Sequence, residues 1–309
     1  MKGLELAKRF YLEYGTPMLR EQFPQLEGMI AVGLAGSGSE CFGYDDDLSQ
    51  DHDFEPGFCL FIPGEEQVDR PTAFALERAY ERLPREFLGF RRSPQKPVGG
   101  NRHGVIRIPD FLLEKTGTPD GQLETRDWFY LPEQALAEAT NGQLFRDDSG
   151  QFTAIRRGLA YLPEEVRLKK LAGHLLLMGQ AGQYNYPRCI ARGELGAARL
   201  AVHEFAGSAL HAAFLLGRRY LPYYKWQFRA LRELPLSVLH QPLETLLNGG
   251  LSPEETTLLI EKICKKMEEA LQEQQLTTLR SGELERQAYA VNDRIAEPNI
   301  RNLHILYGV

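Results

Sequence analysis

Three short apolar runs in the first part of the chain have the length of buried β-strands. They are residues 29–35, residues 58–62 and residues 105–108. The first is followed by Gly-Ser-Gly-Ser and the second by Pro63-Gly64. Apolar runs of this length, bounded by glycine, proline or polar residues, are typical of strands inside a sheet. The pattern therefore predicts a small sheet in the N-terminal part of the chain.

Helical periodicity replaces strand-like runs beyond about residue 128. Apolar residues there recur at the three- and four-residue spacing of one helical face. The predicted helices span residues 132–140, 164–179, 195–216, 223–231, 253–275 and 282–296. Earlier in the chain, residues 4–14 and 72–83 are also predicted to be helical. Gly15-Thr16-Pro17 is expected to end the first of these helices, and residues 85–102 are expected to form a loop.

The change of pattern defines the expected fold class, which is α+β. We predict a mixed sheet with helices in residues 1–130, followed by an all-α helical bundle in residues 131–309. At 309 residues the chain is long enough for two domains with separate cores.

Composition limits the expected partners and cellular compartment of the protein. The formal net charge of -6 argues against a large non-specific nucleic-acid surface, although it leaves a local basic groove open. The four cysteines form no CxxC pair and are interpreted as free thiols in a reducing compartment. No apolar run approaches the ~20 residues that cross a bilayer. We therefore expect a soluble, cytoplasmic protein without a membrane partner.

The candidate chemistry lies between the first two predicted strands. Gly36, Ser37, Gly38 and Ser39 follow the first strand, and glycines with free backbone N–H groups let phosphate oxygens approach the main chain. Asp51 and Asp53 then lie one residue apart on a segment that we expect to be extended, so that both carboxylates point to the same face. Such a pair repels itself unless a cation lies between the two acids, which suits Mg²⁺. A phosphate cradle followed by two acids is what metal-assisted nucleotidyl transfer requires.

These residues resemble the signature of the polymerase-β-type nucleotidyltransferase superfamily, which is Gly-Ser, a spacer and Asp-x-Asp. The whole chain is also similar to an uncharacterised bacterial family, domain of unknown function 4037, over residues 36–61, 185–194 and 220–226. The superfamily resemblance implies that Asp51 and Asp53 bind Mg²⁺, with two ions possible, and that Ser37, with Ser39, contacts the triphosphate. It also implies a helical half like the substrate-binding domains of antibiotic nucleotidyltransferases.

Two positions depart from the superfamily pattern. A later strand usually supplies a third carboxylate, whereas the candidate strand here carries Arg107, with Asp110 just beyond it. The middle residue of the acid pair is His52, where a hydrophobic residue is usual. A site with two acids is expected either to bind metal more weakly or to take its third ligand or general base from the other domain.

The helical half offers two further sets of candidate residues. Residues 220–226 are dense in aromatic side chains; by the resemblance, Lys225 contacts the triphosphate, and Tyr224 is grouped with it. The alternative is that the stem of Lys225 covers apolar surface. In residues 185–194 the predicted nucleotide contacts are Asn185, Arg188 and Arg192, with Glu194 as a general base. The alternative for that segment is a salt-bridged loop. His174, His211 and His240 are interpreted as ordinary helix residues.

The predicted function is Mg²⁺-dependent transfer of a nucleoside monophosphate from a nucleoside triphosphate, such as ATP, to a hydroxyl of a small molecule. A first alternative is a nucleotide-binding regulator without turnover, suggested by Arg107. A second is transfer to RNA or protein, which would require a basic groove drawn from Arg91, Arg92, Lys96 and Arg102.

Overall fold

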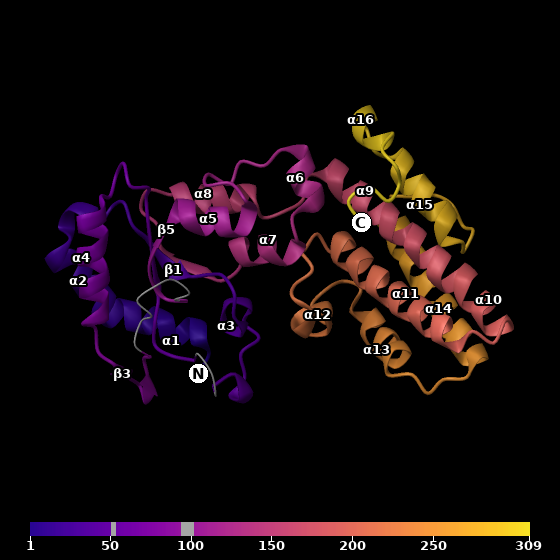
Figure 1. Ribbon diagram of the computed structural model, residues 1–309, viewed down its shortest axis with the longest axis horizontal. Coiled ribbons are helices and arrows are strands. Elements are labelled where there is room, and N and C mark those ends of the chain that lie inside the picture. The colour runs from indigo at the N-terminus through magenta and orange to yellow at the C-terminus, as the bar shows by residue number, and fades with distance from the viewer. Residues whose placement is uncertain (51–53, 94–101) are drawn as a thin grey trace. The chain divides into compact units, whose positions relative to one another are not determined.

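The computed structural model describes residues 1–50, 54–93 and 102–309. The chain forms two compact units (Figure 1). Unit 1 comprises residues 1–123 and 135–160, and unit 2 comprises residues 124–134 and 161–309. The chain therefore passes between the units more than once. The fold is mixed α+β, in agreement with the predicted class.

A four-stranded sheet of order β5-β2-β1-β6 forms the centre of unit 1. Its strands are β1 (Ala31–Leu34), β2 (Cys59–Ile62), β5 (Gly104–Arg107) and β6 (Gln143–Arg146). β1 pairs antiparallel with both β2 and β6, whereas β2 and β5 are parallel. Three of the strands confirm the runs expected from the sequence. All residues of β1 and β2 are buried, which explains why these strands are continuously apolar instead of alternating.

Each face of the sheet is covered by helices of unit 1. On one face, Leu60 and Val32 pack into a core with residues of α1 (Gly3–Phe10) and α4 (Arg70–Glu81). On the other face, Phe61 contacts Phe111 and Phe152 at ring-centroid distances of 5.3 and 4.7 Å. These two rings belong to α5 (Ile108–Thr116) and α8 (Gln151–Gly158). Unit 1 is thus a three-layer arrangement of helix, sheet and helix.

The expected helix break at Gly15-Thr16-Pro17 is wrong. α1 continues through a π-helical turn, Tyr11–Gly15, into α2 (Thr16–Gln22). Proline has no N–H, and the wider π turn accommodates a missing hydrogen bond without ending the helix. Gly15 packs against the ring of Phe58, which leaves no space for a side chain. Packing thus outweighs the local breaker signal.

Two further expectations about residues 85–146 are corrected. The predicted loop contains a small hairpin, β3 (Glu86–Phe87) with β4 (Phe90–Arg91). The chain also forms a strand beyond residue 128. This strand, β6, pairs with β1, which lies more than 100 residues earlier in the sequence. β6 has only two apolar residues and lies at the sheet edge, so that its sequence carries a weak strand signal.

Long helices form unit 2. α9 (Glu164–Met178) packs against α11 (Leu195–Leu216) and α15 (Leu284–Asp293), and α14 (Pro253–Glu273) also contacts α11 (Figure 1). A π-helical turn, Gly179–Asn185, joins α9 to α10 (Tyr186–Ala191). The remaining elements are α3 (Ser39–Phe42), α6 (Thr125–Tyr130), α7 (Glu133–Thr140), α12 (Tyr224–Leu231), α13 (His240–Asn248), α16 (Pro298–Arg301) and short 3-10 turns.

The end of the chain is fixed by a buried lysine in unit 2. Lys169 is fully buried, and its Nζ donates to Asn292 Oδ1 at 2.8 Å and to the carbonyls of Arg301 and Leu303 at 3.0 and 2.6 Å. Three acceptors offset the cost of burying an ammonium group. No helix in the described ranges is long and apolar enough to cross a membrane.

Candidate functional site

The loop after β1 has a backbone conformation that favours glycine at two positions. Gly36 and Gly38 have φ values of +115° and +135°, which favour glycine. Ser37 is exposed, and Gly38 and Ser39 are partly exposed. The N–H groups of Ser37, Gly38 and Ser39 donate no hydrogen bond to any other described residue. They are therefore available to an anion, although α3 is a single turn and adds little dipole.

Asn141 holds this loop from a distant part of the sequence. Its Oδ1 accepts a hydrogen bond from Gly36 N at 2.9 Å, and its Nδ2 donates to Gly36 O at 2.8 Å. The next residue, Gly142, donates from its backbone to Cys41 O at 2.8 Å. Two hydrogen bonds to one peptide residue contribute about 1–3 kcal/mol and restrict the loop to one conformation. The sequence alone does not reveal this contact, because no local pattern links Asn141 to Gly36, which lies 105 residues earlier.

A partly buried ion pair lies beside Gly38. Arg102 Nη2 donates to Ser37 O at 2.9 Å and forms an ion pair with the carboxylate of Glu40, which is 8% exposed. A Cβ atom on Gly38 would overlap Arg102 Nη2. Glycine is therefore required here for space as well as for its backbone angle.

The acid pair itself cannot be placed. Asp51, His52 and Asp53 lie outside the described residues, so their expected extended conformation and Mg²⁺ contacts stay predictions. Among the described residues, no group of three or more His, Cys, Asp or Glu side chains is arranged to hold a metal ion.

Two acids on either side of the pair do have defined surroundings. Asp45 is buried and accepts a hydrogen bond from Gly3 N at 2.8 Å, with Lys2 Nζ 3.5 Å from its other oxygen. Glu55 lies 3.3 Å from His103 Nδ1 and accepts from Ser93 N. Burial alone would raise the pKa of Glu55, but the contacts with His103 and Ser93 outweigh it and lower that pKa. Both carboxylates are thus engaged in packing the segments around the loop.

The strand expected to supply a third carboxylate instead supplies a structural cation. Arg107 ends β5, next to β2, and its Nη1 donates to the carbonyls of Pro63 and Val68 at 3.1 and 2.8 Å. It therefore ties the turn after β2 to β5. Asp110 is exposed in the first turn of α5.

Two of the four cations proposed for a nucleic-acid groove have structural contacts. Arg92 is 8% exposed, lies over the rings of Phe10 and Tyr80, and donates to the carbonyls of Tyr80 and Leu83. Arg102 belongs to the ion pair described above. Arg91 is exposed, and Lys96 lies outside the described residues. This distribution weakens the case for a groove built on these four cations.

In unit 2 the structure separates the two sets of predicted nucleotide contacts. Asn185, Arg188, Arg192 and Glu194 precede α11, whereas Tyr224 and Lys225 begin α12 after it. α11 has 22 residues and is therefore about 33 Å long. Figure 1 shows α10 and α12 at opposite ends of this helix. A single nucleotide cannot span that distance, so the two sets do not form one small-molecule site within unit 2.

The members of both sets are mostly exposed. Lys225 Nζ lies 5.0 Å from the centroid of the Trp226 ring, and Tyr224 is 71% exposed with its ring 4.3 Å from that of Tyr223. At the other end, Arg188 lies over the ring of Tyr184 at 4.7 Å, and Glu194 is exposed at the start of α11. Their roles as ligands or as general base stay predictions.

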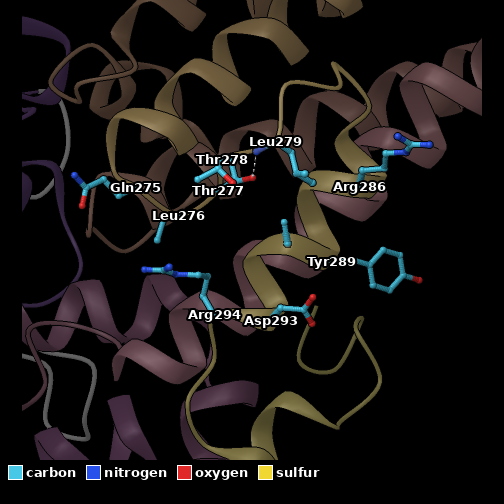
Figure 2. Close-up of a pocket in the computed structure, with 10 residues that line it drawn as sticks. Gln275, Leu276, Thr277, Thr278, Leu279, Arg286, Tyr289, Asp293 and Arg294 are labelled. Atoms are coloured by element: carbon cyan, nitrogen blue, oxygen red, sulfur yellow. Dashed lines mark hydrogen bonds between the residues drawn. The ribbon is translucent and has the colours of Figure 1, made fainter.

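Two of the pockets formed by described residues lie in unit 2, and none of the predicted site residues lines either of them. The first, of about 510 Å³, lies between the end of α14 and α15 (Figure 2) and is lined by residues 275–279, Arg286, Tyr289, Ala290, Asp293 and Arg294. In Figure 2 the Arg294 side chain points toward Leu276, whereas the Tyr289 side chain points away from Leu276. The second, of about 330 Å³, is largely apolar and includes Tyr186, Ile190 and Arg199, close in sequence to Arg188 and Arg192.

One comparison with known proteins gives a match. Residues 128–227 match the model of a family described as "Domain of unknown function (DUF4037)". The search of curated proteins and the search of solved structures gave no match. The matched segment includes residues 185–194 and 220–226, but not the Gly36–Ser39 loop, so the resemblance to the nucleotidyltransferase superfamily stays a prediction. About a third of the chain thus carries the sequence pattern of the DUF4037 family, as the sequence resemblance suggested.

Proposed function

We propose that the protein is a Mg²⁺-dependent nucleotidyltransferase that moves a nucleoside monophosphate from a nucleoside triphosphate to a hydroxyl of a small molecule. The geometry of the loop after β1 supports this proposal most directly. The N–H groups of Ser37, Gly38 and Ser39, which have no partner among the described residues, suit phosphate oxygens, and Asn141 holds the start of this loop at Gly36. The order of loop, acid pair and β2 along the chain is also the order that the resemblance implies.

In this proposal Asp51 and Asp53 would hold one or two Mg²⁺ ions, which would polarise the α-phosphate and neutralise charge on the leaving pyrophosphate. By the resemblance, Tyr224 and Lys225 are assigned to the nucleotide. A second set of predicted residues lies at the other end of α11, so we assign it to a contact separate from that of Tyr224 and Lys225. This set is Asn185, Arg188, Arg192 and Glu194.

Binding calorimetry tests the metal–nucleotide part of the proposal. We expect ATP or another nucleoside triphosphate to bind in the presence of Mg²⁺, and the double variant Asp51→Asn/Asp53→Asn to weaken binding by about tenfold or more. Asp47→Asn is the matched control, because Asp47 is an exposed acid just before the pair. Equal losses in the control and the double variant, or no binding to the wild type, would refute the proposal.

A regulator that binds the nucleotide without turnover is the second candidate. Arg107 favours the regulator. It occupies the strand position at which the superfamily usually has a third acid, and its contacts with Pro63 and Val68 give that position a structural role. Mg²⁺-dependent binding without pyrophosphate release, in the presence of several hydroxyl acceptors, distinguishes the regulator from the enzyme.

A further inference from the structure

The second pocket of unit 2, of about 330 Å³, lies where four helices meet. α11 contacts α10, α13 and α14, and α14 also contacts α10 and α13 (Figure 1). All four helices contribute lining residues, and those from α10 and α11 fall within the segment that matches the family model. Small-molecule sites have volumes of about 300–1,000 Å³. The pocket therefore has the size of a small ligand site, and it is built from unit 2 alone.

Most of the lining is apolar and held in place by burial. Ala198 and Val202 of α11 are each 3% exposed, and Leu246 of α13 is 2% exposed. The remaining apolar lining consists of Ile190, Leu195, Leu251 and Pro253. None of the residues that line the pocket is acidic. Such a surface suits the apolar part of a ligand and excludes a cationic one.

Arg199 of α11 alone carries a charge among the described residues that line the pocket. It is exposed, so it lies at the rim, and a Cβ atom added to Gly249 would be 2.8 Å from its Nη1. Its guanidinium forms no hydrogen bond or ion pair within the described ranges of the chain. Arginine stays charged, and its planar group of N–H donors matches the two oxygens of a carboxylate.

Tyr186 of α10 adds a second polar group to the lining. It is 5% exposed, and its hydroxyl has no hydrogen-bond partner among the residues that the structure describes. By contrast, the other hydroxyl of the lining, that of Thr256, donates to Ser252 O at 2.9 Å. Buried tyrosine hydroxyls usually have a partner. The Tyr186 hydroxyl is therefore available to an oxygen atom of a ligand.

We propose that this pocket binds a small monocarboxylate with an apolar body, which pairs with Arg199, accepts a hydrogen bond from Tyr186 and packs against Val202 and Leu246. One arginine balances one negative charge. A phosphate monoester carries a charge of about −1.5 to −2 at pH 7, so part of its charge would be unpaired beside apolar walls. The inference goes beyond the proposed nucleotidyl transfer and does not depend on it.

The volume sets the length of the ligand. A water-sized group occupies about 30 Å³ in a liquid, so a pocket of about 330 Å³ has room for about ten such groups. A carboxylate with a chain of about eight carbon atoms meets this limit. Octanoate is therefore the probe, and octanol and octyl phosphate are matched probes that differ in the head group.

Titration calorimetry of the full-length wild-type protein with the three probes tests the ligand class. We expect octanoate to bind at one site per chain, and octanol and octyl phosphate to bind about tenfold or more weakly. No binding of octanoate, or equal affinities for octanoate and octanol, would overturn the proposal. Tighter binding of octyl phosphate would replace the carboxylate by a phosphate and overturn the choice of ligand.

Arg199→Gln tests the position of the site. The variant removes the charge of an exposed residue that has no partner in the described part of the chain, so the fold should be kept. We expect it to weaken octanoate binding about tenfold or more and to leave octanol binding unchanged. Arg280→Gln is the matched control, because Arg280 is an exposed arginine of unit 2 outside the pocket. Equal octanoate affinities in the two variants would overturn the role of Arg199.

Tyr186→Phe removes the hydroxyl and keeps the ring. We expect octanoate binding to weaken about threefold or more, and an unchanged affinity would overturn the role of Tyr186. All of these titrations contain neither nucleotide nor Mg²⁺. Absence of Mg²⁺-dependent triphosphate binding would therefore refute the proposed function and leave the octanoate result readable, so failure of the two proposals is distinguishable.

Discussion

The loop after β1 and the Glu133–His211 group represent two ways of building a polar site. The loop is contiguous, partly exposed and made largely of backbone groups, and its side-chain contacts serve to hold the backbone. The group in unit 2 is largely buried. It is made of the side chains of Glu133, Lys170, His174 and His211, which belong to α7, α9 and α11. A backbone site depends on conformation, whereas a buried charged site depends on every partner being present. The two sites should therefore respond differently to substitution.

The largest expected effect is the loss of Glu133. Glu133→Leu leaves Lys170, which is 6% exposed, without its carboxylate, and an uncompensated buried charge costs about 3–5 kcal/mol of unfolding free energy. The double variant Glu133→Leu/Lys170→Met removes both charges and should recover most of that loss. Urea denaturation of both single variants and the double variant measures the coupling. A double variant whose loss equals the sum of the two single losses would show that the pair is not coupled.

Gly38→Ala should lower the unfolding free energy less than Glu133→Leu does, but it should disturb the conformation of the loop after β1 more. Its Cβ would overlap Arg102 Nη2, and its φ of +135° is strained for alanine, at a cost of about 1–3 kcal/mol. We also expect Mg²⁺-dependent triphosphate binding to weaken about tenfold or more, because the N–H groups are displaced.

Gly43→Ala is the matched control for Gly38→Ala. Gly43 has a φ of +72° at the end of α3, and a Cβ there would meet open space. It should lose about 1 kcal/mol of stability, from backbone strain alone, and keep nucleotide binding. If both variants bind nucleotide equally well, the space under Gly38 is not needed for binding.

The same contrast explains what the sequence could predict. The strands around the loop, and the helices corresponding to α9, α11 and α14, follow from local apolar patterns, and the structure agrees with them. β6, the clamp by Asn141 and the π turn before Pro17 depend on contacts with distant residues, which local patterns do not record.

The polar sites show the same difference between local sequence patterns and contacts with distant residues. The Gly36–Ser39 loop stands out in the sequence because its residues are consecutive, and its role in phosphate binding stays a prediction. The structure adds that Gly36 and Gly38 have positive φ values. His174 and His211 were interpreted as ordinary helix residues, because only the packing of α9 on α11 and the position of α7 bring them to Glu133. A buried site made from several helices leaves no local signal in a single sequence.

The smallest expected effect is a pH dependence of stability that belongs only to the group in unit 2. The pKa of His174 is well below its usual 6.5 in the folded protein, so below pH 6.5 the unfolded chain binds a proton that the folded chain excludes. Stability from this residue is therefore complete above pH 6.5 and is lost as the pH falls, by about 1 kcal/mol per pH unit. The lowered pKa of Glu133 acts in the same direction, but only below its usual 4.5, so the pH ranges in which the two residues affect stability are separate.

Urea denaturation between pH 7.5 and 5.5 measures how the unfolding free energy changes with pH. The wild type should show the decrease due to His174, His174→Asn should show a smaller decrease, and Gly38→Ala should keep the wild-type slope. An unchanged slope in His174→Asn would mean that the stacked ring takes up its proton without opposing the fold.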